Sequence, residues 1–419
     1  MRPEEKSTLL GKHQDNPDRR PTAAPFWSWP GTTDATADLL AAEAPAIIRG
    51  HSGALAAGTL VEIQGGHSLG LRRLAPLFGR ALELTDSALT LESLLTGAGP
   101  AALSDLRAVL SPFPPPADLV TDLNAAVVVA NLLFIKGKDR FPDVARSAWL
   151  SLAPGGLFFA VGHRTHAILP FSKVMSEVFG NVTKVANRKG CSLFLSAKEG
   201  PDPAWLALPE TAPRGGTPAP VPAPGSDPAL PFDLASSFWV FAAGQMDGGT
   251  QFLLEHSPSL APPTRATGGT PPGTICDLGC GSGILGMAAA RRYPASRVYL
   301  VDSSASAVAL AARNLAANRI TNAVAGVTTG LAFFPDRSLD LILCNPPFHQ
   351  EHLADHSTAQ AFIAEAKRVL RPGGALEMVA NRFLSYEGPL RAVFGPHAGP
   401  LAQDDAFKLL GARQTPRQF

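Results

Sequence analysis

The chain has 419 residues, of which 45% are hydrophobic and 17% are charged. This apolar content suffices for sizeable cores and excludes a chain that is disordered throughout. The net charge of +1 excludes a uniformly basic nucleic-acid-binding protein, although it leaves room for local basic patches. At roughly 150 residues per domain, the length predicts two or three domains.

The amino-terminal residues are polar and lack the apolar core of a secretion signal, and no run of about 18 apolar residues could span a membrane. The four cysteines show neither a Cys-X-X-Cys pair nor a zinc spacing. We therefore expect a cytoplasmic protein with reduced thiols, without a bound metal or a membrane partner, and we favour a monomer.

Proline divides the chain in two. Residues 201–231 contain ten prolines, which fix φ and remove backbone donors, so this stretch is predicted to be an extended linker. It separates a domain at 26–200 from a domain at 232–419, and residues 1–25 are expected to be a flexible tail.

The two halves of the sequence resemble each other. Four ordered pairs align at offsets between 214 and 218: LAPGGLFFAVGHR with LRPGGALEMVANR, Asn131 with Asn345, Glu62 with Asp277, and Asp86 with Asp302. Such regular spacing indicates an internal duplication.

Each half alternates short apolar runs with helical patterns, which is typical of βαβ units and a parallel sheet. In the second half we expect strands over TICDL, RVYLVD, AVAGV, LDLILC and ALEMVA, and helices over SGILGMAAARRY and SASAVALAARNLAANR. The predicted fold class is α/β, with two tandem Rossmann-like domains that bind ligands at the carboxyl ends of their strands.

A glycine-rich turn, Asp277-Leu278-Gly279-Cys280-Gly281-Ser282-Gly283, follows the first of these strands and opens a helix. Its glycines let backbone amides approach a ligand, and the helix N-terminus offers unpaired donors. Asp277 would repel a pyrophosphate but suits an ammonium or sulfonium group, and Asp302 after the next strand is placed to accept from ribose hydroxyls. These acids favour S-adenosylmethionine, with NAD and a purely structural turn as alternatives.

Asn345-Pro346-Pro347-Phe348 follows LDLILC, and its prolines predict a loop at the carboxyl end of that strand. An amine conjugated to a base is a poor nucleophile because its lone pair is delocalised. The side-chain carbonyl of Asn345 and the backbone carbonyl of Pro346 could accept its N–H groups and aim the lone pair at a methyl donor. Phe348 offers a face for a planar base, or else packs in the core of a proline-rich turn.

The combination DLGCGSG, VD and NPPFH resembles the bacterial class I, S-adenosylmethionine-dependent ribosomal RNA guanine-N2 methyltransferases with a methyltransferase small domain. The segments FIAEAKRVLRPGG and VANRFLSYEGPLRAVFG strengthen the resemblance, which covers roughly Gly58 to Ala412. His349-Gln350 and Asp355-His356 favour the branch that acts on large-subunit (23S) RNA, and the sequence is also similar to the small-subunit (16S) branch.

The resemblance implies a degenerate first methyltransferase domain and a catalytic second one, which methylates N2 of a guanine in 23S ribosomal RNA. It implies catalytic roles for Asn345, Pro346, Pro347 and Phe348, with Phe348 and His349 contacting the base. The cofactor-binding residues that it implies are Asp277, Gly279, Cys280, Gly281, Gly283, Asp302, Ser303, Thr250 and Asn345. Asp247 to Thr250 would line the methionine end of the cofactor, or else cap the following helix.

The sequence departs from the family at Thr328-Thr329-Gly330, which lacks the Asp or Asn that usually contacts the adenine amino group. Adenine is therefore expected to be held through the backbone or elsewhere. His349 is expected to pack in its loop or contact the base, with proton acceptance as the alternative. Cys280 and Cys344 have no evident base beside them and are expected to be packing residues.

The first half keeps only Gln64-Gly65-Gly66-His67-Ser68 and Asn131-Leu132-Leu133-Phe134 of the two motifs. We expect this half to bind no cofactor and to help hold RNA. Two groups of basic residues could neutralise phosphates, or form a solvated face: Lys136, Lys138 and Arg140, and Lys184, Arg188 and Lys189.

Three rival functions are kept: the same reaction on 16S RNA, methylation of a protein glutamine amide, and an inactive RNA-binding protein. Enzymes of the glutamine type more often carry Tyr at the position of Phe348. The intact Asp277, Asp302 and Asn345 argue against an inactive protein.

Overall fold

The computed structural model describes residues 35–51, 58–64, 74–88, 106–115, 117–133, 135, 137–201, 203, 232–237, 239–244, 246–261, 271–346 and 356–415. The predicted tail at 1–25 lies outside these residues, as does most of the predicted linker at 201–231. Among the residues that are described, none of the helices has the length and apolar character needed to cross a membrane.

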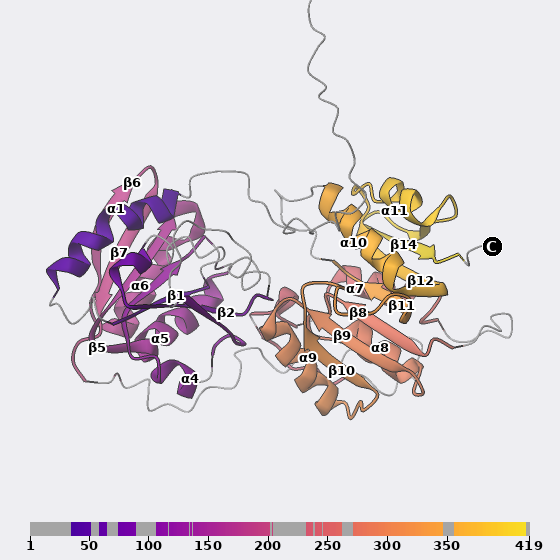
Figure 1. Cartoon of the computed structure of the whole chain (residues 1–419), viewed down its shortest axis with the longest axis horizontal. Coiled ribbons are helices and arrows are strands. Elements are labelled where there is room, and N and C mark those ends of the chain that lie inside the picture. The colour runs from indigo at the N-terminus through magenta and orange to yellow at the C-terminus, as the bar shows by residue number, and fades with distance from the viewer. Residues whose placement is uncertain are drawn as a thin grey trace, which may run out of the picture. The chain divides into compact units, whose positions relative to one another are not determined.

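Each half of the chain carries one seven-stranded sheet (Figure 1). The strands of the first are β1 (Thr59–Ile63), β2 (Arg80–Thr85), β3 (Leu106–Leu110), β4 (Ala125–Asn131), β5 (Leu152–His163), β6 (Thr183–Arg188) and β7 (Cys191–Ala197). Its helices include α1 (Ala35–Gly50), α4 (Ala117–Thr121), α5 (Phe141–Ser151) and α6 (Ile168–Phe179), and the 3-10 turn η3 spans Arg164–His166.

The second sheet contains β8 (Thr274–Leu278), β9 (Arg297–Asp302), β10 (Ala323–Val327), β11 (Leu339–Cys344), β12 (Leu370–Asn381), β13 (Gly399–Gln403) and β14 (Phe407–Arg413). Its helices are α7 (Gly248–His256), α8 (Ile284–Arg292), α9 (Ala305–Ala317), α10 (His356–Val369) and α11 (Glu387–Phe394), and the 3-10 turn η5 spans Phe241–Gly244.

The two sheets have the same strand order. It is β3-β2-β1-β4-β5-β7-β6 in the first and β10-β9-β8-β11-β12-β14-β13 in the second, so each strand of one has a counterpart in the other. This is the topology that the predicted duplication requires. The predicted parallel direction is correct for six strands of each sheet. Of the described strands, only β7 and β14 run the opposite way, each antiparallel to both of its neighbours, and they make both sheets mixed.

The strand register also matches between the halves. Glu62 of β1 lies opposite Val129 of β4, and Asp277 of β8 lies opposite Leu343 of β11. Two residues beyond Val129 comes Asn131, and two beyond Leu343 comes Asn345. The aligned acids and the aligned asparagines therefore occupy equivalent places in the two sheets.

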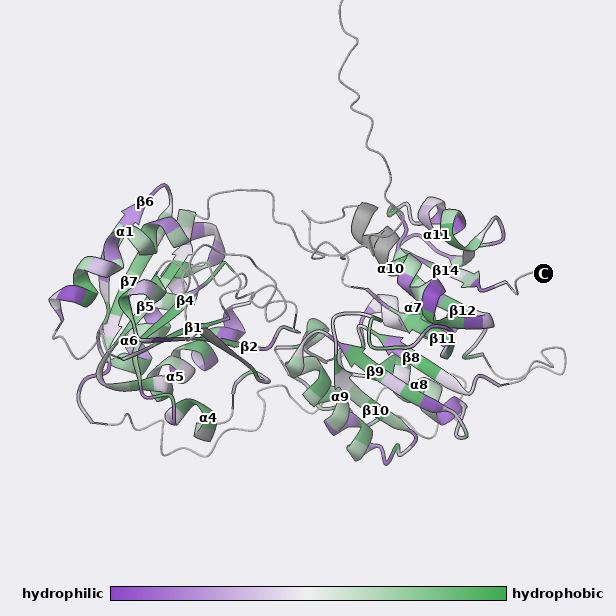
Figure 2. Ribbon diagram, viewed as in Figure 1, coloured by the Kyte–Doolittle hydropathy of each residue, from purple (hydrophilic) through white to green (hydrophobic). Residues whose placement is uncertain are grey.

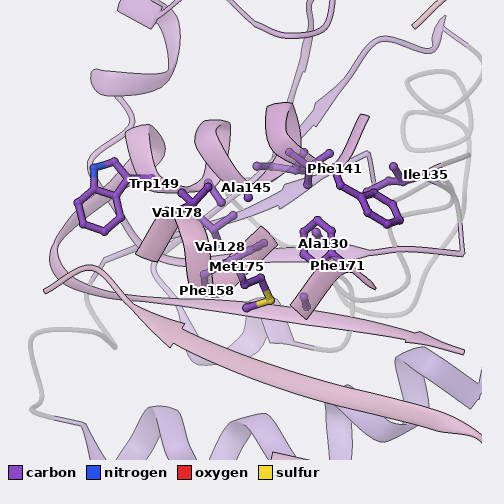
Figure 3. Packing of buried hydrophobic residues seen from close by; sticks show 14 of the residues in the cluster. Val128, Ala130, Ile135, Phe141, Ala145, Trp149, Phe158, Phe171, Met175 and Val178 are labelled. Carbon is purple, nitrogen blue, oxygen red and sulfur yellow. The ribbon is translucent and has the colours of Figure 1, made fainter. Parts of the chain in front are cut away.

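Alternating strand residues build a core on each face of a sheet. In the first half Val128, Ala130 and Phe158 pack against residues of α5 and α6, as the close-up in Figure 3 shows. Their neighbours Val127 and Phe159 lie in the separate core that contains α1. The hydropathy colouring in Figure 2 shows the central strands as largely apolar, as expected for strands covered on both faces.

In the second half the core with α7, α8 and α9 includes Ile275 and Leu343, and the opposite core with α10 and α11 includes Cys276 and Cys344. The predicted strands at TICDL, RVYLVD, AVAGV and LDLILC match β8 to β11 residue for residue, and ALEMVA forms residues 375–380 of the longer β12, which ends one residue later. The predicted helices match α8 and α9 within two residues at each end.

Candidate active site

The glycine-rich turn lies between β8 and α8, where the sequence predicts it. Gly279, Gly281 and Gly283 all have positive φ, at 69°, 53° and 88°. At Gly283 a Cβ would lie 2.8 Å from Cδ2 of Leu300, so a larger residue would meet both backbone strain and a clash.

The backbone amides of this turn are already bonded within the protein. The N–H groups of Gly279 and Cys280 donate to the Val301 carbonyl at 2.8 and 3.0 Å, and that of Gly281 donates to Oδ2 of Asp302 at 3.0 Å. The glycines therefore permit the tight turn and let other groups lie close to its backbone. They do not present the N–H groups of residues 279 to 281 to a ligand.

Asp277 is fully buried on the face of β8 that packs against α8. Its Oδ2 accepts from the N–H of Gly286 at 2.7 Å, while Oδ1 has no hydrogen-bond partner among the described residues. Burial raises the pKa of Asp277 to about 7, and the hydrogen bond from Gly286 opposes this shift only in part. A buried carboxylate oxygen without a partner fits a cationic ligand nearby.

Asp302 ends β9 with both carboxylate oxygens oriented by the backbone. Oδ1 accepts from the N–H of Ser304 at 2.9 Å and Oδ2 from that of Gly281 at 3.0 Å. Burial is the main cause that raises the pKa of Asp302, and the backbone donors oppose it. Each oxygen retains a lone pair, which suits the hydroxyls of a ribose. The next residue, Ser303, is half-buried at the same sheet edge.

Asn345 lies just beyond β11 in a network that fixes the orientation of its amide. Nδ2 donates to both carboxylate oxygens of Asp247 at 3.1 Å and to Oγ1 of Thr250 at 3.0 Å. Because an ionised carboxylate only accepts hydrogen bonds, the nitrogen of the amide must face Asp247. The side-chain carbonyl oxygen is thereby left to accept from a substrate.

Asp247 is also the N-cap of α7. Its Oδ1 accepts from the N–H groups of Gly249 and Thr250 at 2.9 and 3.3 Å, and its Oδ2 accepts from the hydroxyl of Thr250 at 2.6 Å. A Cβ at Gly249 would lie 3.2 Å from Oδ1 of Asn345, so glycine permits this close approach. Of the two predicted roles for Asp247 to Thr250, the structure shows the helix cap and adds the contact with Asn345.

A cavity of about 130 Å³ opens beside this network. The residues that line it come from η5, the start of α7, the Asn-Pro segment, the end of β12 and the start of β14: Phe241, Asp247, Gly248, Asn345, Pro346, Val379, Ala380, Asn381 and Phe407. Sequence reasoning missed Phe241, Asn381 and Phe407, because the first lies in the short turn η5 and the other two lie at the ends of β12 and β14, where no catalytic motif marks them. The one signal in the sequence for Asn381 is that it occupies, in the segment VANR, the position that His163 has in the aligned segment of the first half.

The turn after β10 begins at Thr328, whose N–H donates to the Asp302 carbonyl at 2.9 Å. Thr328, Thr329 and Gly330 are half-buried there, and Gly330 has a φ of 102°. No carboxylate or carboxamide side chain lies within these three residues, as the sequence states, so the backbone of this turn is the part that could meet adenine.

The two cysteines beside the site, Cys280 and Cys344, are both buried. Burial raises the pKa of the Cys280 thiol and of the Cys344 thiol well above the usual value, and the charges of Asp277 and Asp302 raise both further. Neither thiol is available as a thiolate nucleophile near neutral pH.

Several predicted residues lie outside the described part of the chain: Pro347, Phe348, His349, Gln350 and Asp355, and, in the first half, Gly65 to Ser68, Phe134 and Lys136. Lys138, Lys184, Arg188 and Lys189 are exposed, and Arg188 pairs with Glu43 at 2.5 Å. Arg140 is only half-exposed, and its guanidinium lies 4.9 Å from the centroid of the Trp239 ring.

In the first half Asn131 has different partners from Asn345. Its Nδ2 donates to Oγ1 of Thr36 at 2.8 Å, and its Oδ1 accepts from the N–H of Leu133 at 3.2 Å. The side-chain carbonyl is thus used within the loop. Among the described residues, no group of three or more His, Cys, Asp or Glu side chains could hold a metal ion.

A family model described as the methyltransferase small domain matches residues 232–411. The ribosomal RNA small subunit methyltransferase C of Pseudomonas paraeruginosa is 33% identical over 287 residues, which are 68% of this chain and 79% of that protein. The chain belongs to the family of S-adenosylmethionine-dependent ribosomal RNA methyltransferases. The predicted family, enzyme class and cofactor are confirmed.

Both branches of the family are represented among the relatives. The ribosomal RNA large subunit methyltransferase G of Streptomyces griseus is 36% identical over 247 residues, which are 57% of this chain and 59% of that protein. A solved structure of the T. thermophilus 16S rRNA N2 G1207 methyltransferase with AdoMet and guanosine is similar with a TM-score of 0.72. It is 23% identical, covers 92% of this chain and 93% of that one, and shows that the fold is shared.

Proposed function

We propose that the chain methylates the exocyclic N2 amine of a guanine in ribosomal RNA, and that this RNA is the 23S RNA of the large subunit. The observation that carries the proposal is the orientation of the Asn345 amide, whose nitrogen is held by Asp247 and Thr250. Its carbonyl oxygen is available at a cavity that Pro346 also lines.

Two acceptors suit the chemistry of an aromatic amine. The N2 amine of guanine is planar, because its lone pair is delocalised into the ring. If Oδ1 of Asn345 and the backbone carbonyl of Pro346 accept its two N–H bonds, the nitrogen is drawn towards tetrahedral geometry and its lone pair is aimed in one direction. The carboxylate behind Asn345 polarises the amide and makes its oxygen a stronger acceptor.

The residues near the carboxyl ends of β8 and β9 fit the cofactor. S-adenosylmethionine supplies an activated methyl group when it is bound. Asp302, held by the N–H groups of Gly281 and Ser304, would accept from its ribose hydroxyls, and the buried charge of Asp277 would attract its cationic end. The positive φ values of Gly279, Gly281 and Gly283 let the backbone lie close to the ligand.

The choice of 23S RNA rests on the residues after Asn-Pro-Pro, His349-Gln350 and Asp355-His356, and on the large-subunit relatives. The Streptomyces avermitilis large subunit methyltransferase G is 39% identical over 173 residues, 41% of this chain. The 16S RNA is the second candidate, because the small-subunit relative from Pseudomonas matches a longer part of the chain.

Methyl transfer to RNA from cells that lack the protein tests the proposal. The full chain is incubated with S-adenosylmethionine that carries a labelled methyl group and with total ribosomal RNA and protein from such cells, and Asn345→Ala serves as the control. We expect label in N2-methylguanosine, confined by primer extension to one site in 23S RNA. Label in 16S RNA would show that the substrate is the small-subunit RNA. Label in a protein glutamine would show that the substrate is a protein, and absence of label would refute the enzymatic function.

A further inference from the structure

A second hollow, of about 600 Å³, adjoins the cavity at Asn345. It is lined by Asn381, Arg382, Phe383, Asp405 and Ala406, and Asn381 lines both spaces. The residue at the end of β12 is therefore the shared wall between the proposed guanine site and this more open hollow. The second hollow therefore offers a nearby place for a nucleotide next to a guanine that enters the first space.

Phe383 is the exposed apolar group of the second hollow, with 78% of its surface accessible to solvent. It is held at the tip of a tight turn, in which the N–H of Leu384 donates to the Asn381 carbonyl at 3.1 Å. The preceding N–H, of Arg382, donates to the Ala406 carbonyl at 2.9 Å. The ring of Phe383 is thus exposed on a turn whose backbone is hydrogen-bonded at the residue before it and at the residue after it.

The charges around Phe383 favour the face of a base over a phosphate. The only cation among the residues that line this hollow, Arg382, donates to the Asp404 carbonyl and to Oδ1 of Asp405, both at 3.1 Å. Asp405 is fully exposed, and Asp404 adds a second negative charge nearby. A phosphate would be repelled by these two carboxylates, whereas an uncharged base would stack on the ring without that cost.

The duplicated half offers an internal comparison. Its β5 corresponds to β12, and the N–H of Arg164 donates to the Gly190 carbonyl, as that of Arg382 does to Ala406. The next residue is Thr165 in the first half and Phe383 in the second. The turn is kept in both copies, but at this position a phenyl ring is present only in the half whose asparagine carbonyl is available.

We infer that Phe383 is a stacking platform for the base next to the target guanine, in a strand of RNA that passes over Asn381. The inference rests on the proposed function and extends it to a binding site for a neighbouring nucleotide. Stacking of this kind accepts any base, so Phe383 contributes to RNA affinity and not to the choice of sequence.

The test uses short single-stranded RNAs with a central guanine and either a base or an abasic nucleotide beside it, on each side in turn. Phe383→Ala should raise KM for the intact RNA by about 5- to 150-fold, the loss typical of a base-stacking ring. It should leave kcat and KM for the RNA that is abasic at the stacked position unchanged. Phe383→Trp should restore the KM of the intact RNA. Phe333→Ala is the matched control, because Phe333 is 75% exposed and lines neither space.

A second readout does not require turnover. An RNA with 2-aminopurine beside the guanine is titrated with the full chain and S-adenosylhomocysteine, and we expect quenching by wild type and by Phe383→Trp but not by Phe383→Ala. Equal quenching by wild type and Phe383→Ala, or an equal loss on intact and abasic RNA, would overturn the platform. Failure of the proposed function is distinct, since it would appear as absence of methyl transfer by the wild-type chain to any guanine.

Discussion

The amide nitrogen of Asn345 donates to both carboxylate oxygens of Asp247 at 3.1 Å, across 98 residues of sequence. This contact joins the loop after β11 to the first turn of α7. Because the amide nitrogen is held by Asp247, the side-chain carbonyl oxygen of Asn345 is the end of the amide that can accept from a substrate amine.

Asn345→Ala removes that acceptor. We expect kcat to fall by about 100-fold or more, the usual loss for a missing catalytic hydrogen-bonding group, while the Kd for S-adenosylhomocysteine stays nearly constant. Single-turnover kinetics and calorimetric titration measure the two quantities. Full residual activity would remove Asn345 from the mechanism.

Asp247→Ser separates orientation from helix capping. Serine is an equally good N-cap, so α7 and the melting temperature should be kept, but its hydroxyl cannot hold Nδ2 of Asn345 as the carboxylate does. We expect kcat to fall by about 10-fold or more at unchanged stability, because the amide can now turn. Unchanged kcat with a folded variant would show that the orientation needs no help from Asp247.

The affinity for S-adenosylhomocysteine should depend on pH through Asp277. The pKa of this buried carboxyl is about 7 in the unliganded fold, so it is neutral below that pH and negative above it. A ligand with an ammonium group should bind more tightly as the pH rises from about 5 to about 7, and then level off. Asp277→Asn should bind with a flat profile over this range, and a pH dependence that persists in the variant would assign it to another group.

The same carboxyl should affect stability with the opposite sign. Its folded-state pKa of about 7 lies above the unfolded value of about 3.9, so the folded state holds the proton longer. The free energy of unfolding of the unliganded chain should therefore decrease as the pH rises from about 4 to about 7, by up to about 4 kcal/mol. Denaturant titrations of wild type and Asp277→Asn at several pH values would measure the difference in their free energies of unfolding. This difference should vanish below about pH 4, where the carboxyl is protonated in both the folded and the unfolded state.

Gly286→Ala tests the packing of α8 on β9. A Cβ there would lie 2.5 Å from Cγ of Leu300, so the gain in helix propensity is outweighed by overpacking. We expect a loss of about 1–3 kcal/mol in the free energy of unfolding. Gly326→Ala is the control, since a Cβ there meets nothing within 4 Å, and an equal loss in both would point away from this contact.

The first half can be tested for RNA binding through its exposed lysines. Replacing Lys138, Lys184 and Lys189 with alanine should weaken binding and lower the slope of log affinity against log salt by about 1 for each phosphate that a lysine no longer neutralises. Arg140→Ala should instead lower stability, because that guanidinium packs beside Trp239. An unchanged salt slope in the lysine variant would make this half a scaffold.

The sequence by itself determined the strands and helices of the second half, the duplication and the glycine-rich turn, because each depends on local periodicity and spacing. It also placed Asp277, Asp302 and Asn345 near one edge of the sheet, since the carboxyl ends of parallel strands meet there. Only the tertiary structure decided that Asp247 orients Asn345, that the amides of the turn are already bonded, and that Phe383 stands beside the cavity. These relations join segments far apart in the chain, and no local pattern encodes which distant groups will satisfy a polar side chain.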